Sequence, residues 1–294
     1  MMYEYLPKIH FILPGGGVRG AFQAGFMYNL FNKHENDFTI ARIDGTSVGS
    51  LNGFAIMNRK YENLKNIWLN INNINDLFSN WSDKYLIGRI SSCIHGFYNN
   101  GIFSNNKIKE SIINNSKDTW EDYGENYKEK YACAVVNLKT ASTEYIDGTN
   151  KDIVDYITAS ASPWIISNPV SINDTLYTDG CLLETYPIKN IGKCDADLTV
   201  IVGYDQEHIK YIPGENYNIL QYLANLIDIS RFNSQNHIET KKIIDKSKVV
   251  SIASPMNLNI TDIDKEQIKD GFDIGMDFAN TFYDTYIKNF EKNN

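Results

Sequence analysis

The sequence predicts an α/β fold in which a mostly parallel central sheet is flanked by helices. Short, continuous apolar runs such as Leu198–Gly203 are typical of buried parallel strands. Segments with apolar residues at helical spacing alternate with these runs, which favours a layered α/β architecture. No linker, repeat or change of composition divides the chain. We therefore expect residues 1–294 to form a single domain.

The first expected element is a strand, Lys8–Leu13, which ends in a glycine-rich stretch, Pro14–Gly20 (PGGGVRG). Apolar residues then recur at helical spacing within residues 21–34, so a helix follows. Successive glycines between a strand and a helix let backbone N–H groups converge on an anion or an oxyanion. The sequence therefore predicts an anion-binding loop at this position.

Two functions compete for this loop. Gly15, Gly17 and Gly20 also satisfy the dinucleotide-binding pattern G-x-G-x-x-G. Asp44, which lies 24 residues past Gly20, is close to where such a site needs an acid for the ribose. Two features count against nucleotide binding. Arg19 puts a cation in the loop, and the next strand runs into a second turn with glycines of its own.

That second turn lies in Phe38–Gly53, which has the pattern of a strand, a sharp turn and the start of a helix. At its centre, Gly45, Ser47 and Gly49 form a G-x-S-x-G pattern. A nucleophile elbow needs both glycines, because the chain turns straight from strand to helix around a strained serine. Ser47 Oγ would stand exposed near the helix N-terminus, where the dipole favours developing negative charge. Taken alone, the pattern is also compatible with an ordinary tight turn.

Residues 58–130 are polar and rich in asparagine and aromatic residues. Their periodicity predicts one helix at Tyr61–Asn70 and another at Asn105–Asn114, with Ser104 as the N-cap of the second. The aromatic residues of this region are expected to form core or to line an acyl cavity, namely Trp68, Phe78, Trp81, Phe97 and Phe103.

The rest of the chain continues the alternation of strands and helices. The expected elements are strand Tyr131–Leu138, its hairpin partner Thr143–Ile146, helix Ile153–Ser160, a short strand and turn in Asn173–Cys181, an element from Pro187 and Ile188, strand Leu198–Gly203, helix Ile219–Ile229, strand Val249–Ala253 and one or two helices from Thr261 onward. Residues 262–266 lack the glycine and the spacing of a calcium loop, so we expect a helix to start there.

Composition excludes several classes of protein. The net charge of −8 and the lack of a Lys/Arg run argue against a nucleic-acid partner. The four cysteines show no pairing or metal-ligand pattern, so we expect reduced thiols and no metal site. No signal peptide and no uninterrupted apolar stretch of about 18 residues is recognisable. We expect a soluble, cytoplasmic protein that uses no cofactor.

Four landmarks follow one another along the chain: GGGVRG at 15–20, GTSVG at 45–49, ASASP at 159–163 and Asp179-Gly180. With this order and these separations, the chain resembles the patatin-like phospholipase family. The landmarks define a motif-bearing core of about residues 8–205, and the helical C-terminal part, 206–294, is less diagnostic. The resemblance implies a patatin-like three-layer fold.

The resemblance also implies a catalytic Ser–Asp dyad in place of a triad. Ser47 would be the nucleophile and Asp179 its base, and a carboxylate, being a weak base, would need a desolvated pocket for this task. The backbone N–H groups of Gly16, Gly17 and Val18 would form the oxyanion hole. The supporting positions are Gly15, Arg19, Gly20, Gly45, Gly49 and Gly180. 

One residue departs from the family pattern. After Asp179-Gly180 the family usually has Gly or Ala, whereas this chain has Cys181. The thiol puts the local packing in question and leaves the aspartate in place. We expect Cys181 to be a packing residue.

The sequence therefore predicts a lipid acyl hydrolase of the phospholipase A type, which cleaves a phospholipid or another acyl-ester lipid and contacts a membrane surface transiently. Three alternatives stay open. The chain could be a nucleotide-binding α/β protein that uses residues 15–20, or a catalytically silent relative that binds lipid. It could also be a triad hydrolase, for which His208 is the best placed of five histidines because it follows a buried strand.

Overall fold

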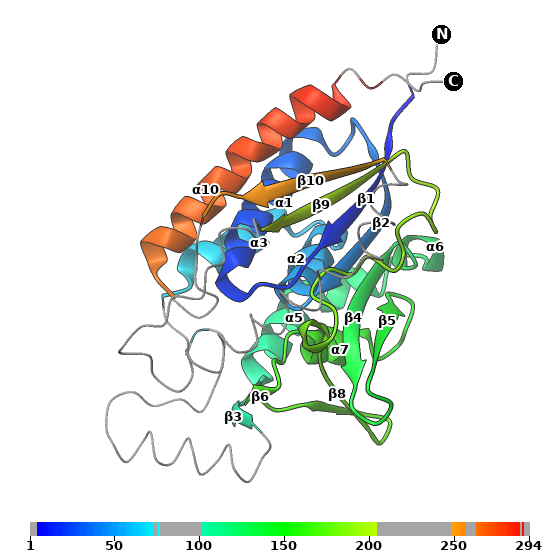
Figure 1. Ribbon diagram of the computed structural model, residues 1–294, viewed down its shortest axis with the longest axis vertical. Coiled ribbons are helices and arrows are strands. Elements are labelled where there is room, and N and C mark those ends of the chain that lie inside the picture. Colours follow the sequence, from blue (N-terminus) through cyan, green and yellow to red (C-terminus); the bar gives the residue numbers. More distant parts are fainter. Residues whose placement is uncertain are drawn as a thin grey trace.

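The computed structural model describes residues 5–72, 76, 101–204, 248–256, 263–288 and 290. Its centre is a sheet of eight strands, drawn as arrows in Figure 1. Along the sheet the order is β10 (Val249–Ser254), β9 (Leu198–Tyr204), β1 (Lys8–Leu13), β2 (Thr39–Thr46), β4 (Tyr131–Asn137), β8 (Thr175–Asp179) and β7 (Val170–Ile172), and β5 (Ser142–Asp147) pairs with β4. The first five strands in this order are parallel. The predicted α/β fold with a mostly parallel central sheet flanked by helices is confirmed.

Helices lie between many of the strands, and the last helix follows β10. They are α1 (Gly20–His34), α2 (Val48–Met57), α3 (Tyr61–Asn70), α5 (Asn106–Trp120), α6 (Glu125–Lys128), α7 (Ile153–Ser160) and α10 (Lys265–Phe282), which continues into a π-helical turn (Tyr283–Ile287). Two 3₁₀ turns, Gly17–Arg19 and Gly180–Leu182, follow β1 and β8, and β3 (Gly101–Phe103) pairs with β6 (Ile165–Ser167) in a small separate sheet. The helices expected at Tyr61–Asn70 and Ile153–Ser160 have the predicted bounds.

One face of the sheet carries the main core. Side chains of β1, β4 and β9 on this face pack with α1, α2, α7 and α10 in one apolar cluster. Helix α10 lies along α1 (Figure 1), where Phe22 meets Phe278 with ring centroids 5.4 Å apart. A Cβ on Gly25 would lie 1.9 Å from the carbonyl oxygen of Phe272, and one on Gly275 would lie 2.0 Å from that of Phe22. Glycine on both helices therefore permits their close approach.

The other face of the sheet is covered, in the part of the chain that the structure describes, by residues 183–197. Ile12 and Ile201 pack here against Ile191, with Tyr186 and Ile188 beside them. An element was expected to begin at Pro187 and Ile188, and this prediction is wrong. Residues 183–197 form turns, bends and irregular structure, with no helix or strand. Local bonds such as Ile191 N–H to Ile188 O close single turns only, while Thr185 O accepts from Gly15 N–H of the glycine-rich loop and Asp197 N–H donates to Lys8 O of β1.

The observed starts of two helices, α5 and α10, can be compared with the predicted ones. Helix α5 begins one residue later than expected, with Asn105 as its N-cap, and it continues to Trp120. The Asn105 amide donates to Ser162 Oγ and to Asn168 O, both at 3.0 Å, so tertiary contacts set this boundary. The helix start expected in residues 262–266 is confirmed: Asp264 is the N-cap of α10 and accepts from Glu266 N–H at 2.9 Å. The helix expected at Ile219–Ile229 lies outside the described residues.

Candidate active site

Ser47 occupies a strained turn between β2 and α2. Its backbone has φ 56° and ψ −127°, a conformation that residues other than glycine rarely adopt. Such a backbone costs roughly 1–3 kcal/mol and persists only where the surroundings enforce it. The strand-to-helix turn predicted for the G-x-S-x-G pattern is therefore present.

The two glycines of the pattern are required by close packing. A Cβ on Gly45 would lie 2.5 Å from Ser50 Cα, at the start of α2. A Cβ on Gly49 would lie 2.0 Å from Leu13 O, at the end of β1. Both distances are far below ordinary contact, so a side chain at either position would push the serine out of place.

The register of β4 brings Ser47 to Asp179. Strand β2 runs parallel to β4 and its last residue, Thr46, pairs with Ala134. Strand β8 runs antiparallel to β4, and its last residue, Asp179, pairs with the next residue, Val135. Strand β5 pairs with one edge of β4, so β2 and β8 both pair with the other edge. The C-terminal ends of β2 and β8 therefore face each other. Residues 132 positions apart in sequence thus become neighbours.

The two side chains are hydrogen-bonded. Ser47 Oγ donates to Asp179 Oδ2 at 2.6 Å, and the residues are only 8% and 2% exposed. The other carboxylate oxygen, Oδ1, accepts from the backbone N–H of Cys181 at 2.8 Å. A Cβ on Gly180 would lie 2.5 Å from Ala134 O, so glycine lets the chain turn tightly between these two residues.

The glycine-rich loop passes beside this pair. Gly15 donates its N–H to Thr185 O at 3.1 Å, and a Cβ on Gly15 would lie 2.7 Å from Ser47 Cβ. Gly17 has φ 57° and opens a 3₁₀ turn in which Arg19 N–H donates to Gly16 O at 3.2 Å. Among the described residues, the backbone N–H groups of Gly16, Gly17 and Val18 donate to no backbone acceptor. Within the part of the chain that the structure describes, these three predicted oxyanion donors therefore have no backbone partner.

A buried amide network that the sequence did not indicate supports the loop from behind. The Gln23 side chain donates to Pro14 O at 3.2 Å and to Val202 O at 3.1 Å, so it ties the loop to β9. Asn52 donates to Gly20 O at 3.1 Å and to Gln23 Oε1 at 2.9 Å. Helical periodicity alone assigned these polar side chains no role, since it does not indicate which buried helix faces meet a loop.

Two more of the predicted supporting residues, Gly20 and Arg19, are buried next to the glycine-rich loop. A Cβ on Gly20 would lie 2.5 Å from Val48 Cγ2, so glycine allows α1 to approach α2 beside the serine. Arg19 ends the 3₁₀ turn, and its side chain is buried.

Among the aromatic residues expected in the core or in an acyl cavity, Trp68 is buried, and its indole N–H donates to Asn52 Oδ1 at 2.9 Å. Phe78, Trp81 and Phe97 lie outside the described residues.

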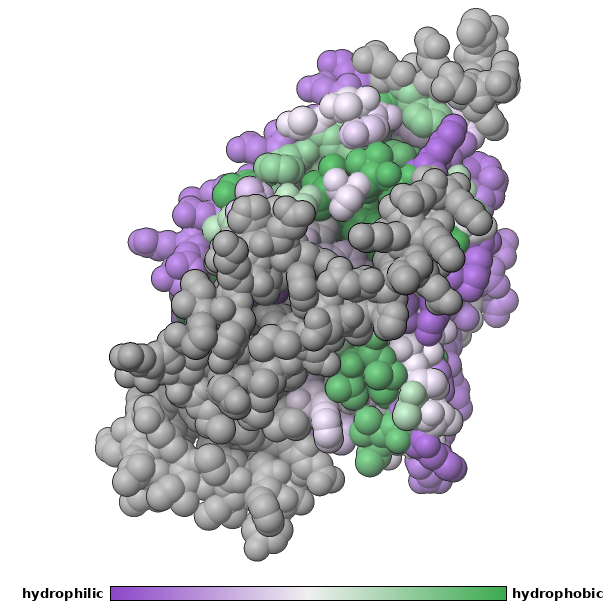
Figure 2. Space-filling view, in the orientation of Figure 1, coloured by the Kyte–Doolittle hydropathy of each residue, from purple (hydrophilic) through white to green (hydrophobic). Residues whose placement is uncertain are grey.

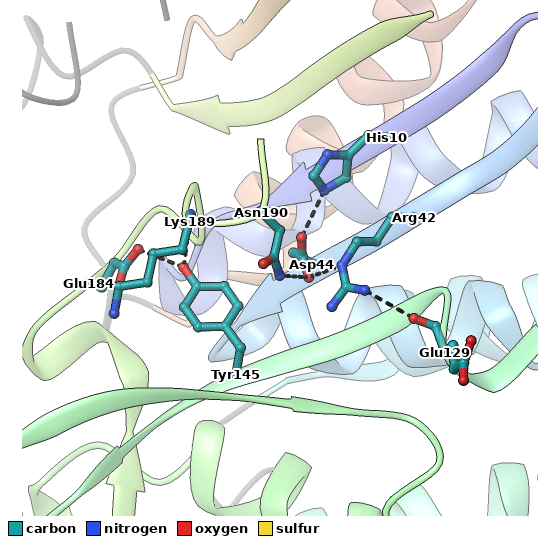
Figure 3. A network of polar contacts seen from close by, with 8 residues as sticks. All are labelled: His10, Arg42, Asp44, Glu129, Tyr145, Glu184, Lys189 and Asn190. Carbon is teal, nitrogen blue, oxygen red and sulfur yellow. Dashed lines mark hydrogen bonds and ion pairs between the residues drawn. The ribbon is translucent and has the colours of Figure 1, made fainter. Parts of the chain in front are cut away.

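Asp44 is committed to a buried polar network, shown in Figure 3. Its carboxylate accepts from Arg42 Nε at 2.8 Å and from Asn190 Nδ2 at 3.1 Å, and it contacts His10 Nε2 at 2.8 Å. Burial lowers the pKa of His10, but the hydrogen bond to Asp44 and the nearby Cys194 thiol outweigh this and raise the pKa above its ordinary value. A fully buried carboxylate with these partners is unsuited to hold a ribose, which counts against nucleotide binding.

The described histidines do not approach the serine. His10 bonds to Asp44, and His34 contacts Asp37 at 3.2 Å and stacks on Tyr283. His95, His208 and His237 lie outside the described residues.

The described residues contain no group of three or more acidic, histidine or cysteine side chains that could hold a metal ion. None of the described helices combines the length and the hydropathy needed to cross a bilayer.

Fold and site together define a class: an α/β protein with a buried Ser–Asp pair at a strand-to-helix turn. A family model described as "Patatin-like phospholipase" matches residues 11–190, which is more than half of the 294 residues. The chain belongs to the patatin-like phospholipase family, and the resemblance seen in the sequence is confirmed. At the level of the family, it is a lipid acyl hydrolase.

Comparisons with individual proteins add little. Among solved structures, the chain is similar to the one described as "Crystal structure of VipD from Legionella pneumophila". The sequence identity is 12% and the TM-score 0.46, over 95% of this chain and 67% of that chain. No curated protein sequence matches this chain.

Proposed function

We propose that this protein is a phospholipase A-type esterase that cleaves fatty-acyl esters with Ser47 as nucleophile and Asp179 as base. The observation that carries the proposal is the 2.6 Å hydrogen bond from Ser47 Oγ to Asp179 Oδ2 at a strained strand-to-helix turn. Membership of a phospholipase family gives the substrate class. The proposed substrate is a phospholipid or a related acyl-ester lipid.

In the proposed acylation step, Ser47 Oγ attacks the carbonyl carbon of the ester while Asp179 takes the hydroxyl proton. The ester oxygen leaves with that proton as an alcohol, and the acyl group stays on Ser47. The proton transfer is direct, because Asp179 Oδ2 already accepts the hydrogen bond of Ser47 Oγ at 2.6 Å.

In the proposed deacylation step, a water molecule attacks the acyl carbon of the acyl-enzyme. Asp179 takes a proton from this water and returns one to Ser47 Oγ as the fatty acid leaves. The hydrogen bond from Cys181 N–H to Oδ1 holds the carboxylate so that Oδ2 faces the serine in both steps. One residue therefore serves as base and acid in turn.

The proposed oxyanion hole consists of the N–H groups of Gly16, Gly17 and Val18. Preorganised donors of this kind usually contribute the largest single catalytic effect. The contacts of Gly15 with Thr185 O and with Ser47 support this role, since they hold the loop against the nucleophile. Arg19 would add a positive charge to the same loop. The reaction would need no metal and no cofactor.

Contact with a membrane surface would be transient. Large apolar side chains are exposed on segments that flank the site in sequence, at Trp164, Leu176 and Leu183. Figure 2 shows apolar surface over the region where Figure 1 shows α7 and β8. The net charge of −8 disfavours anionic lipid. Cosedimentation with phosphatidylcholine vesicles tests this, and strict dependence on anionic lipid would contradict it.

The decisive experiment is covalent labelling with a fluorophosphonate. Intact mass should increase by one adduct, and peptide mapping should place that adduct on Ser47. Ser47→Ala should stay unlabelled, whereas Ser142→Ala should keep the label, because Ser142 is an exposed residue at the start of β5 and its hydroxyl bonds to Thr140 Oγ1. A folded wild-type protein that neither labels nor hydrolyses acyl esters would favour the silent lipid-binding alternative.

Independence of metal ions is a separate prediction. Activity on a chromogenic acyl ester should survive prolonged treatment with EDTA, because both proposed proton transfers use Asp179 alone. Loss of activity on chelation, with recovery on addition of calcium, would rule the proposed mechanism out.

A further inference from the structure

We propose that Ser160, the last residue of α7, is a positioning residue that holds the nucleophile in its strained conformation. Its hydroxyl accepts the backbone N–H of Ser47 at 3.0 Å and donates to Ala134 O at 2.7 Å. The side chain is fully buried, so water cannot replace either bond. The inference rests on the proposed function, in which Ser47 is the nucleophile.

The position of this hydroxyl follows from the sheet. Thr46 pairs with Ala134, so the next bond of the parallel β2–β4 ladder would run from Ser47 N–H to Ala134 O. In place of that direct bond, Ser47 N–H donates to Ser160 Oγ, and Ser160 Oγ donates to Ala134 O. The hydroxyl therefore bridges the two backbone groups at the point where the ladder ends. Without it, a buried donor and a buried acceptor would lose their partners, which is unfavourable because neither group can reach water.

The peptide of Ser47 is thereby held at both ends. On the carbonyl side, Ser47 O accepts from Ser50 N–H at 2.9 Å and from Ser50 Oγ at 2.6 Å. On the amide side, Ser160 is the partner, and it comes from a helix distant in sequence. These bonds oppose the relaxation of the strained backbone of Ser47. Ser160 therefore acts on the direction of Ser47 Oγ through the backbone, without touching the substrate.

The same bond has a second consequence. Because the N–H of Ser47 is donated to Ser160, it is not available to a developing oxyanion. The donors must then come from other backbone groups, which agrees with the open N–H groups of the glycine-rich loop. This arrangement is consistent with the proposed oxyanion hole, which does not include the N–H of Ser47.

The test compares Ser160→Ala with the wild type, using active-site titration by the fluorophosphonate together with steady-state kinetics. Ser160→Ala should keep a full titre and a KM within about threefold of the wild type, while kcat falls about a hundredfold, as expected for a displaced nucleophile. Thr158→Val is the matched control, since it removes a buried hydroxyl of the same helix that bonds only to Val154 O. Its kcat should match that of the wild type.

A second variant covers the case in which Ser160→Ala does not fold. Ser160→Cys keeps the shape of the side chain but replaces the oxygen by a weak acceptor, so kcat should again fall while circular dichroism stays native. A kcat per titrated site within about threefold of the wild type in either folded variant would overturn the inference. A wild type that is inert and unlabelled would instead remove the proposed function, and the two failures are therefore distinct.

Discussion

Ser47 and Asp179 share one proton in the proposed mechanism, so neither residue can act alone. Ser47→Ala and Asp179→Asn should each lower kcat by roughly three or more orders of magnitude, and the double variant should be scarcely worse than either. Single-turnover kinetics on a chromogenic acyl ester provide the measurement, with circular dichroism to confirm folding.

The control for this pair is a histidine. His34→Gln should keep substantial activity, because His34 contacts Asp37 and Tyr283 and not the serine. An active Asp179→Asn variant combined with one inactive histidine variant, His208→Gln above all, would identify a triad hydrolase and contradict the dyad.

Cys181 contributes to the site through its backbone. Its N–H holds Asp179 Oδ1, while its Sγ fills the space beside Gly15, where a Cβ would lie only 2.1 Å away. Cys181→Ala keeps the N–H and removes the sulfur, so most of kcat should remain while the free energy of unfolding falls by about 1 kcal/mol. Kinetics and urea denaturation measure the two effects. A hundredfold loss of kcat in a folded variant would show that the thiol takes part in the reaction.

At the scale of elements, the glycine-rich loop offers a matched pair of substitutions. Gly17 and Gly192 both have positive φ, at 57° and 74°, but Gly192 lies in open space on the 183–197 segment. Alanine at either position should cost about 1–2 kcal/mol of stability through backbone strain. Only Gly17→Ala should also displace an oxyanion donor, which costs roughly 2.7–4 kcal/mol in the transition state.

Steady-state kinetics with thermal unfolding separate these two effects. Gly17→Ala should lower kcat far more than it weakens substrate binding, and Gly192→Ala should shift the melting temperature alone. Equal losses of kcat in the two variants would mean that the loop acts only through stability. Loss of affinity for NAD or ATP in Gly17→Ala, with no effect on hydrolysis, would revive the nucleotide-binding alternative.

For the whole molecule, the buried His10–Asp44 contact predicts how stability depends on pH. The pKa of His10 is raised in the folded protein, so its protonated form stabilises the fold. This contribution is fully present below the unfolded-state pKa of about 6.5 and is lost as the pH rises through the higher folded-state value. The groups that face this pair are Arg42, Asn190 and Cys194.

His10→Gln supplies the comparison, because glutamine can bond to Asp44 without titrating. The melting temperature of the wild type should exceed that of His10→Gln at pH 6 by a few degrees, on the order of 2–4 °C for each kcal/mol. The difference should shrink as the pH rises. A difference that stays constant between pH 6 and 9 would show that His10 is neutral in the folded protein.

Much of the fold was accessible from the sequence because its signals are local. Apolar runs and helical spacing located β1, β9, α3 and α7, and glycines flanking Ser47 predicted the sharp turn. The order of four motifs indicated the family and, through it, Asp179. The 183–197 segment was predicted less well, because it consists of single turns that pack on the sheet through isolated contacts such as Ile191 on Ile12, and such a segment has no periodicity to read.

The sequence by itself determined the family, the strand-to-helix turn and the two side chains proposed for the chemistry. Only the tertiary structure decided how they meet. The register on β4 makes β2 and β8 end head to head, which places Ser47 Oγ 2.6 Å from Asp179 Oδ2. The tertiary structure also brings Ser160 Oγ within hydrogen-bond distance of Ser47 N–H, and it buries the Asp44 carboxylate, which accepts from Asn190 Nδ2. These contacts join residues far apart in the chain, and neither propensity nor spacing specifies a partner for a buried hydroxyl or carboxylate.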